Sequence, residues 1–410
     1  MDDNARLLLF DDDQGRFGPM TDLRPLLELA TAAISPRRRI EHHLGLVTAA
    51  ARLPERYAAG FAERYPELAV NDQLEAGDWL LVSGRWNGVT RLQDVLELET
   101  GEALVEADTG SLVAARLDAE KATGCLDHGG RVPAGVSVRE ASERVLISRP
   151  WHVLDELEDL LVRDIALLGL PEMAPAADPQ IVGEHPVLVA EDAKLMPGVV
   201  IIAEQGPVAI DRHATIQPFC AIEGPCYIGT GSTLAAHTAI RPGTAIGSTC
   251  KVGGEVSASV IQEFSNKAHL GYLGNSLVGR WCNLGAATTV SNLKNTYGPV
   301  RVQLEPDGEP ENSGRTFHGP ILGDYVRTAI GTRLLTGSVV GTGAMVALST
   351  YPPKHTRRMG FYTDRGPRPQ QMPSFEKTTR LMQARRGREP EPAELKRLRE
   401  LHAATWSDVI

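Results

Sequence analysis

The sequence has few cysteines and few aromatic residues, and it contains no long apolar run. Five cysteines are scattered over 410 residues without a Cys-x-x-Cys pair, which excludes a disulfide framework and a zinc ribbon. No stretch approaches the roughly 18 apolar residues of a membrane-spanning helix, and no basic segment followed by an apolar run marks a secretory signal. We therefore expect a cytoplasmic protein with no membrane insertion.

The net charge is also of the wrong sign for a general nucleic-acid binder. The formal charge is -10, and nucleic-acid phosphates are recognised mainly by clustered Lys and Arg, so we expect no nucleic-acid partner. Residues 351–410 differ, with 13 Lys and Arg against seven Asp and Glu. Helices are expected there near Ser374 to Arg386 and Ala393 to Trp406, and a cap on the preceding domain is favoured over a binding arm.

The chain is too long for one ordinary core, so two or more domains are expected. Prolines and alanines concentrate in 169–182, which indicates a linker. Before it, 1–168 reads as an α/β domain. Its expected strands are 7–10 and 79–83, and its expected helices are 22–33, 37–51 and 149–168.

Glycine is abundant, with 40 residues, and aliphatic residues recur at every sixth position over part of the chain. Eight of them recur strictly, at Ile210, Ile216, Ile222, Ile228, Leu234, Ile240, Ile246 and Val252. Aliphatic residues at the same six-residue spacing also occur before residue 210 and after residue 252, which gives about 19 hexads in all. One inward aliphatic per hexad is typical of a parallel β-helix with three hexads per coil, and the pattern resembles the left-handed β-helix of hexapeptide-repeat acyltransferases. The predicted fold is thus an α/β domain, a left-handed parallel β-helix over 183–350, and a helical tail over 351–410.

Polar residues concentrate near the predicted interruption of the ladder at 258–274. A motif that begins within this interruption and continues beyond it is formed by His269, Leu270, Tyr272, Leu273, Gly274, Val278, Gly279, Asn283, Leu284, Gly285, Ala286, Thr288 and Asn292. This run resembles the acetyltransferase half of the GlmU-type enzymes, which acetylate glucosamine 1-phosphate and then uridylylate the product. Arg241 and Glu255 also stand where that family has an arginine and a glutamate.

The resemblance implies a role for each of these residues. His269 would be the general base that takes a proton from the amine attacking acetyl-CoA, the co-substrate. The phosphorylated amino sugar would be bound by Arg241, Glu255, Lys267, Tyr272, Asn283 and Asn292. Ala286 and Thr288 would contact acetyl-CoA. The resemblance also implies a homotrimer and a product of the UDP-N-acetylglucosamine type.

Two residues depart from the family pattern at positions that bear on substrate binding, and two histidines bear on a metal site. Ser257 stands where the family has a second phosphate-binding cation, and Ala287 stands where glycine is usual. His213 and His237 are the histidines best placed for the zinc site of some hexapeptide β-helices. Their separation of 24 residues, one coil plus one hexad, puts them on different faces.

The start of the chain resembles the opening of sugar nucleotidyltransferases. A strand leads to a loop with Gly15, Arg16, Thr21 and Arg24, which we expect to contact the nucleotide or phosphate. Three aspartates, 11–13, replace the usual glycines and would repel a triphosphate unless Mg²⁺ intervened. This pattern resembles a variant branch of GlmU-type proteins with an altered first loop.

These observations predict a transferase of amino-sugar nucleotide metabolism with an acetyltransferase β-helix and a nucleotidyltransferase-like first domain. Two alternatives stay open. The protein could carry only nucleotidyltransferase activity, or it could be a non-catalytic scaffold or regulator that binds sugar nucleotides.

Overall fold

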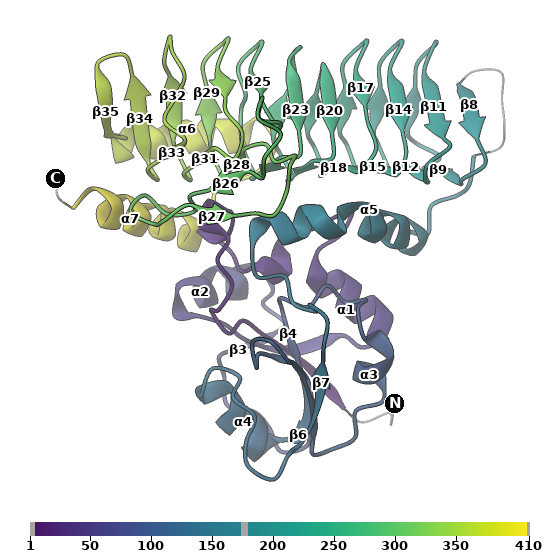
Figure 1. The fold of residues 1–410 in the computed structure, drawn as a ribbon, viewed down its shortest axis with the longest axis vertical. Helices are drawn as coiled ribbons and strands as arrows, with labels where there is room; N and C mark the ends of the chain where they lie inside the picture. Colours follow the sequence, from purple (N-terminus) through teal and green to yellow (C-terminus); the bar gives the residue numbers. More distant parts are fainter. Residues whose placement is uncertain (1–4, 174–178, 408–410) are drawn as a thin grey trace.

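A computed structural model describes residues 5–173 and 179–407, and it contains an α/β domain docked beneath a parallel β-helix (Figure 1). Two helices at the end of the chain pack on the far part of the β-helix. The predicted fold class is confirmed. Part of the predicted linker, 174–178, lies outside the described residues.

The first domain is built on a seven-stranded sheet in the order β3-β2-β1-β4-β6-β5-β7. Its strands are β1 (Arg6–Phe10), β2 (Thr48–Arg52), β3 (Ala69–Val70), β4 (Asp78–Ser83), β5 (Glu102–Glu106), β6 (Leu112–Asp118) and β7 (Ser137–Ala141). Its helices are α1 (Pro36–Leu44), α2 (Glu55–Arg64), α3 (Leu92–Leu96), α4 (Ala119–Asp127) and α5 (Pro150–Leu167). Strands β1 and β4 are parallel neighbours, so the loops that follow them lie at the same edge of the sheet.

Two of the expected helices in this domain are wrong in part or in whole. The segment 22–33 contains only the short 3-10 turn Leu26–Glu28, preceded by the turn Gly18–Thr21. Pro25 disfavours helical backbone at residue 24, and the segment is held by the β-helix instead. The expected helix over 37–51 stops at Leu44, because Gly45 has a φ of 65° and caps it, and strand β2 follows.

The β-helix has three faces, numbered here in chain order. The first is formed by β9 (Val187–Val189), β12 (Val208–Ile210), β15 (Cys226–Ile228), β18 (Thr244–Ile246), β21 (Val260–Ile261), β24 (Leu277–Val278), β28 (Ile321–Leu322), β31 (Val339–Val340) and β33 (His355–Thr356). The second is formed by β10 (Lys194–Leu195), β13 (Thr215–Ile216), β16 (Thr233–Leu234), β19 (Lys251–Val252), β22 (Asn266–Lys267), then β29 (Arg327–Thr328), β32 (Met345–Ala347), β34 (Gly360–Thr363) and β35 (Gly366–Pro369). Asn283 bridges β22 to β29 and makes the second face continuous.

The third face runs beside these two. It is formed by β8 (Gln180–Gly183), β11 (Val200–Ala203), β14 (Ala221–Glu223), β17 (Ala239–Ile240), β20 (Glu255–Ser257), β23 (Tyr272–Gly274), β25 (Thr289–Val290) and β30 (Arg333–Leu334). A small hairpin, β26 (Arg301–Val302) and β27 (Glu311–Asn312), forms within the long loop 291–320.

The predicted hexad aliphatics point inward and form one continuous core. Ile210, Ile216, Ile222 and Ile228 are among its fully buried members. The predicted interruption at 258–274 is wrong, because the ladder continues there through Val256, Ile261 and Leu273 in shortened coils. Because these coils are shorter, their inward residues depart from the six-residue spacing and could not be recognised in the sequence.

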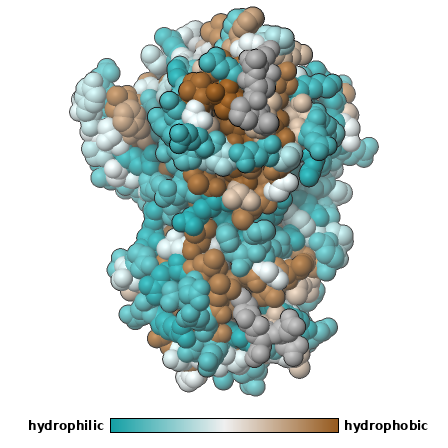
Figure 2. All heavy atoms as spheres, turned by 90° about the vertical axis from the view of Figure 1, so that its right-hand side faces the viewer, coloured by the Kyte–Doolittle hydropathy of each residue, from teal (hydrophilic) through white to brown (hydrophobic). Residues whose placement is uncertain are grey.

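Helix α5 holds the first domain against the first face of the β-helix (Figure 1). Its apolar side, which includes Trp151, Leu157 and Leu161, packs on outward residues of that face such as Tyr227 and Leu277. Seen from the β8 end of the molecule, polar side chains cover most of the surface, and apolar side chains gather at the end of the β-helix (Figure 2). Within the described ranges, no helix is both long and apolar enough to span a membrane.

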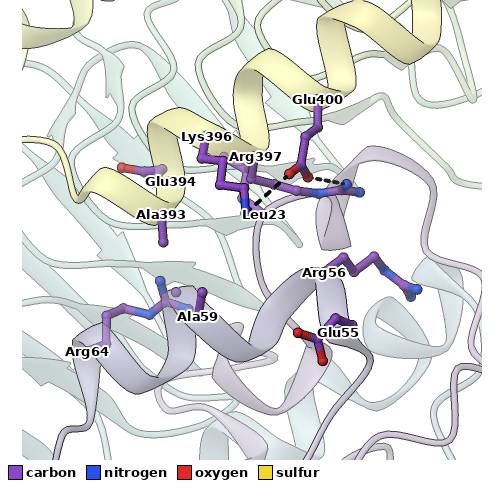
Figure 3. A pocket seen from close by; sticks show the side chains of 11 residues that line it. Leu23, Glu55, Arg56, Ala59, Arg64, Ala393, Glu394, Lys396, Arg397 and Glu400 are labelled. Atoms are coloured by element: carbon purple, nitrogen blue, oxygen red, sulfur yellow. Dashed lines mark hydrogen bonds and ion pairs between the residues drawn. The ribbon is translucent and has the colours of Figure 1, made fainter.

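The tail forms α6 (Met372–Ala384) and α7 (Pro392–Trp406), which pack on the β-helix around Tyr325 and Met359. Helix α7 also faces α2 of the first domain across a small hollow (Figure 3). Arg397 and Lys396 pair with Glu400 there, and the free space is about 50 Å³. A hollow of this size holds a few water molecules, so this seam joins the two parts and does not form a substrate site.

Candidate functional site

Four of the predicted site residues lie on consecutive rungs of the third face. Arg241 follows β17, Glu255 is on β20, Tyr272 is on β23, and Asn292 follows β25. Rungs of a β-helix are about 4.8 Å apart, so the row extends over about 14 Å. The structure therefore brings together residues that are up to 51 positions apart in the sequence.

Arg241 lies between two carboxylates at one end of this row. Its guanidinium pairs with Glu223, and its Nε donates to Glu255 Oε1 at 3.3 Å. The hydrogen bond and charge of Glu223 raise the pKa of Arg241, so the guanidinium stays protonated. The side chains of Arg241 and Glu255 are 44% and 45% exposed, which leaves the pair open to a ligand. A phosphate would compete with the carboxylates for the arginine fork.

Tyr272 lies at the other end, in a network of side-chain hydrogen bonds. Asn292 donates its Nδ2 to the Tyr272 hydroxyl at 2.9 Å and to Asn275 Oδ1 at 2.7 Å. Burial raises the pKa of the Tyr272 phenol, so it stays protonated at neutral pH. A Cβ at Gly274 would lie 2.1 Å from the Tyr272 hydroxyl oxygen, so glycine is required for this placement. Asn275 was not foreseen, and its sequence signal is only its place one residue after Gly274.

His269 is exposed at the corner between β22 and β23, three residues before Tyr272. Within the part of the chain that the structure describes, its imidazole has no hydrogen-bond partner. Its backbone carbonyl accepts from the Lys267 amine at 2.8 Å, which ties the corner to the interior of the β-helix. An exposed, unpartnered imidazole beside a polar row is available to a substrate.

Lys267 occupies a different place from the one expected of a substrate ligand. It is an inward residue of β22, 3% exposed, in register with Val252 of the preceding coil. Its amine donates to the carbonyl oxygens of Gly253 at 2.6 Å and His269 at 2.8 Å. Burial lowers the pKa of Lys267 to about 8. Its geometry is that of a residue that positions the His269 corner.

Asn283 lies on the second face, and Ala286 and Thr288 follow it at the corner that leads to β25, one coil beyond the corner that carries His269. Asn283 is exposed and accepts from Asn266 Nδ2 at 3.4 Å. Ala286 lies at a corner, where its carbonyl accepts from the Gly331 N–H at 2.7 Å. The Thr288 hydroxyl is buried and lies 2.8 Å from that of Thr328. The Thr288 backbone lies against Gly271, next to Tyr272, whereas Asn283 is on the second face and does not share a surface with Tyr272 or Arg241.

The Asp-rich loop after β1 is closed by ion pairs with two arginines that the sequence did not single out. Arg85 contacts both carboxylate oxygens of Asp12, at 2.8 and 2.5 Å, and both side chains are buried. Arg56 pairs with Asp13. The signal for Arg85 was its place two residues after β4, beside the end of β1. The arginines neutralise the repulsion that three aspartates would otherwise create.

The space next to this loop is small. Residues Asp11, Gly15, Phe17, Thr21 and Tyr57 contribute to a cavity of about 20 Å³, which is room for about one water molecule. The Phe17 ring covers Gly15, since a Cβ there would lie 2.2 Å from the ring. Thr21 takes part through its carbonyl, which accepts from the Tyr57 hydroxyl at 2.5 Å.

The two other predicted phosphate contacts of this loop are engaged elsewhere. Arg24 forms a buried ion pair with Asp324 of the β-helix, with Nη1 2.6 Å from Oδ2. Arg16 is half exposed and lies 3.1 Å from Glu311 in the long loop of the β-helix. Both arginines thus join the two parts of the chain in this structure.

The residues of this loop do not fit a Mg²⁺ ion. Arg85 occupies the Asp12 carboxylate, Arg56 occupies that of Asp13, and burial raises the pKa of Asp11 to about 6. Over the described ranges, no group of three or more His, Cys, Asp or Glu side chains could hold a metal ion. His213 pairs with Asp192, and His237 stacks on Phe219, so the zinc alternative gains no support.

Comparison with known proteins matches residues 7–170 to the sugar nucleotidyl transferase family. This segment runs from β1 to the end of α5. The chain is also 29% identical over 224 residues to the bifunctional protein GlmU of Jannaschia sp., covering 54% of this chain and 44% of that protein. It is 37% identical over 144 residues to a bifunctional sugar-1-phosphate nucleotidylyltransferase/acetyltransferase of Sulfurisphaera tokodaii, or 35% of each chain.

Over part of its length, the chain is thus similar to GlmU-type proteins. The predicted resemblance is therefore confirmed. The matched segments span less than half the length of these curated relatives. Among solved structures, a UDP-N-acetylglucosamine acyltransferase from Francisella novicida is similar, with 14% identity and a TM-score of 0.32 over 54% of this chain and 77% of that one.

Proposed function

We propose that the β-helix of this GlmU-type relative transfers an acetyl group from acetyl-CoA to the amine of a phosphorylated amino sugar. The observation that carries the proposal is the exposed His269 imidazole beside the third-face row of Arg241, Glu255, Tyr272 and Asn292. The kinship to bifunctional nucleotidylyltransferase/acetyltransferases supports the reaction class.

In the proposed reaction, the substrate amine attacks the thioester carbonyl of acetyl-CoA. The new C–N bond forms as the C–S bond breaks, His269 takes the amine proton, and the thiolate of CoA leaves and is protonated. Arg241 holds the sugar phosphate through its guanidinium fork. Tyr272, held by Asn292, donates to the sugar.

The site is an open surface within one copy, and Asn283 lies on the second face. We propose that a second copy in a homotrimer completes it, so that residues of the second face of one protomer meet the third-face row of its partner. Such an arrangement would bring Asn283 of one protomer to the third-face row of another.

An acceptor screen tests the reaction. The purified full chain is given acetyl-CoA, and CoA thiol release is measured with glucosamine 1-phosphate, with unphosphorylated glucosamine, and with N-acetylglucosamine 1-phosphate. Turnover is expected only with the first. Absence of turnover with glucosamine 1-phosphate would refute the proposal.

The family match of residues 7–170 favours a second candidate, nucleotidyl transfer from a nucleoside triphosphate to a sugar 1-phosphate in the first domain. The ion-paired loop would have to open to admit the nucleotide, because only about 20 Å³ is free. Pyrophosphate release from UTP and N-acetylglucosamine 1-phosphate tests this activity. Binding of UDP-N-acetylglucosamine without release would make the domain a sugar-nucleotide binder.

A further inference from the structure

The second face carries a pocket near the C-terminal end of the β-helix, remote from the third-face row. Its floor is a row of outward residues in register, Arg327, Met345, Phe361 and Arg368, from β29, β32, β34 and β35. The start of α6 forms one wall, with Ser374 and Phe375 among its residues. The volume is about 430 Å³, within the range of small-molecule sites.

The charge of this pocket is entirely positive. Arg327 and Arg368 line it, and no carboxylate does. Glu376 of α6 is turned to Arg399, at 2.6 and 2.8 Å. Among the residues that the structure describes, neither Arg327 nor Arg368 has a carboxylate oxygen within 4 Å.

Arg327 is the unusual member, because its Nη2 is buried and has no hydrogen-bond partner in the described chain. Other buried arginines, such as Arg39 and Arg85, each meet an aspartate. Leaving a buried charged donor unsatisfied costs free energy, so such groups are usually paired with a protein group or a ligand. Burial also lowers the pKa of Arg327. An anion in the pocket would satisfy this guanidinium.

The apolar residues of the pocket narrow the class of anion. The guanidinium of Arg368 lies 4.8 Å from the centre of the Phe361 ring, and that of Arg327 lies 5.8 Å from the Phe375 ring. Two forked cations on aromatic rings, next to the Met345 side chain, offer both phosphate contacts and a surface for a flat ring. Inorganic phosphate alone would leave most of the volume unfilled.

We propose that this pocket binds the phosphates of a nucleotide-type ligand between Arg327 and Arg368, with the base against the aromatic and methionine side chains. The inference makes no use of His269 or of the first domain. The ligand could be a free nucleotide or the nucleotide part of coenzyme A, which share this chemistry.

Calorimetry on the full chain tests the site without turnover, with ADP, UDP, inorganic pyrophosphate and CoA as probes. The variants are Arg327→Met and Arg368→Met, and the matched control is Arg333→Met. Arg333 is an exposed arginine of the same β-helix that lies over the Tyr351 ring. Arg368 is exposed and Arg327 has no ion pair to lose, so both variants should keep the unfolding temperature of the wild type.

We expect ADP or UDP to bind, with at least a tenfold weaker affinity in each of the two variants and no change in Arg333→Met. If CoA competes with ADP for the pocket at similar affinity, the ligand is the nucleotide part of CoA. If ADP binds and CoA does not compete with it, the ligand is a separate nucleotide. The proposal is overturned if no nucleotide binds, if Arg327→Met binds as the wild type does, or if Arg333→Met loses as much. His269→Ala should bind as the wild type does, so this test is independent of the acetyl transfer.

Discussion

Arg24 and Asp324 form a buried ion pair that joins the first domain to the β-helix. They are 300 residues apart in the sequence, their side chains are 3% and 2% exposed, and both guanidinium nitrogens reach the carboxylate, at 2.6 and 3.3 Å. Asp324 also accepts from the Arg280 N–H at 2.7 Å. The segment after the nucleotidyltransferase-like loop is thus fastened to the β-helix.

Replacing Arg24 by Met should destabilise the chain strongly, because Asp324 would stay buried without its cation. Loss of one partner of a buried pair costs about 3–5 kcal/mol. The measurement is the free energy of unfolding in urea. Arg16→Met is the control, since the Arg16 side chain is half exposed and its pair with Glu311 should contribute less than about 1 kcal/mol. Equal losses in the two variants would contradict the assignment of Arg24.

Gly274→Ala should impair acceptor binding without unfolding the β-helix. The new methyl group would collide with the Tyr272 hydroxyl and break its hydrogen bond with Asn292. We expect the KM for the amino-sugar phosphate to rise about tenfold, and Tyr272→Phe to show a similar rise, since one hydrogen bond is worth about 1 kcal/mol or somewhat more. A normal KM in both variants would show that Tyr272 does not contact the acceptor.

The buried Lys267 predicts a rise in stability at alkaline pH. Its pKa is about 8 in the folded chain and higher when unfolded, so between these values the unfolded state binds more protons. Stability attributable to this group should therefore rise from about pH 8 to the usual lysine pKa, by up to about 3 kcal/mol. Urea unfolding at several pH values measures this rise, and Lys267→Met should lack it. The same pH dependence in both proteins would place the titrating group elsewhere.

Added Mg²⁺ should leave the thermal stability of the chain unchanged. The arginine partners of Asp12 and Asp13 already occupy the carboxylates that would bind the ion. A thermal unfolding scan with and without millimolar Mg²⁺ should show a shift below about 1 °C. A shift of several degrees would mean that the loop opens and binds metal, as an active nucleotidyltransferase of this type would require.

The β-helix could be predicted from the sequence because its signal is local and repeated. Each hexad places one aliphatic inward, and eight strict repeats from Ile210 to Val252 leave little room for another interpretation. The coil around Lys267 was not predicted, because it is shorter than 18 residues. The shorter coil shifts the phase of the six-residue repeat, and its inward position is occupied by a lysine instead of an aliphatic residue.

The structure of the first domain was harder to predict from the sequence, because it depends on contacts between residues that are far apart in the chain. The segment 22–33 is apolar enough to suggest a helix, yet it is held as irregular chain by Asp324 and by Gln262, whose side chain bonds both backbone groups of Ala30. Local periodicity carries no information on such partners. The same holds for Arg56 and Arg85, whose pairing with the aspartates closes the loop.

The most direct test of the central claim is acetyl transfer by His269→Ala compared with His237→Ala. Both histidines are exposed at the corner between the second and third faces, two or three residues past an inward residue, and His237 additionally stacks on Phe219. With acetyl-CoA and glucosamine 1-phosphate, we predict at least a hundredfold lower kcat in His269→Ala and an unchanged kcat in His237→Ala. Wild-type turnover in folded His269→Ala would contradict the account.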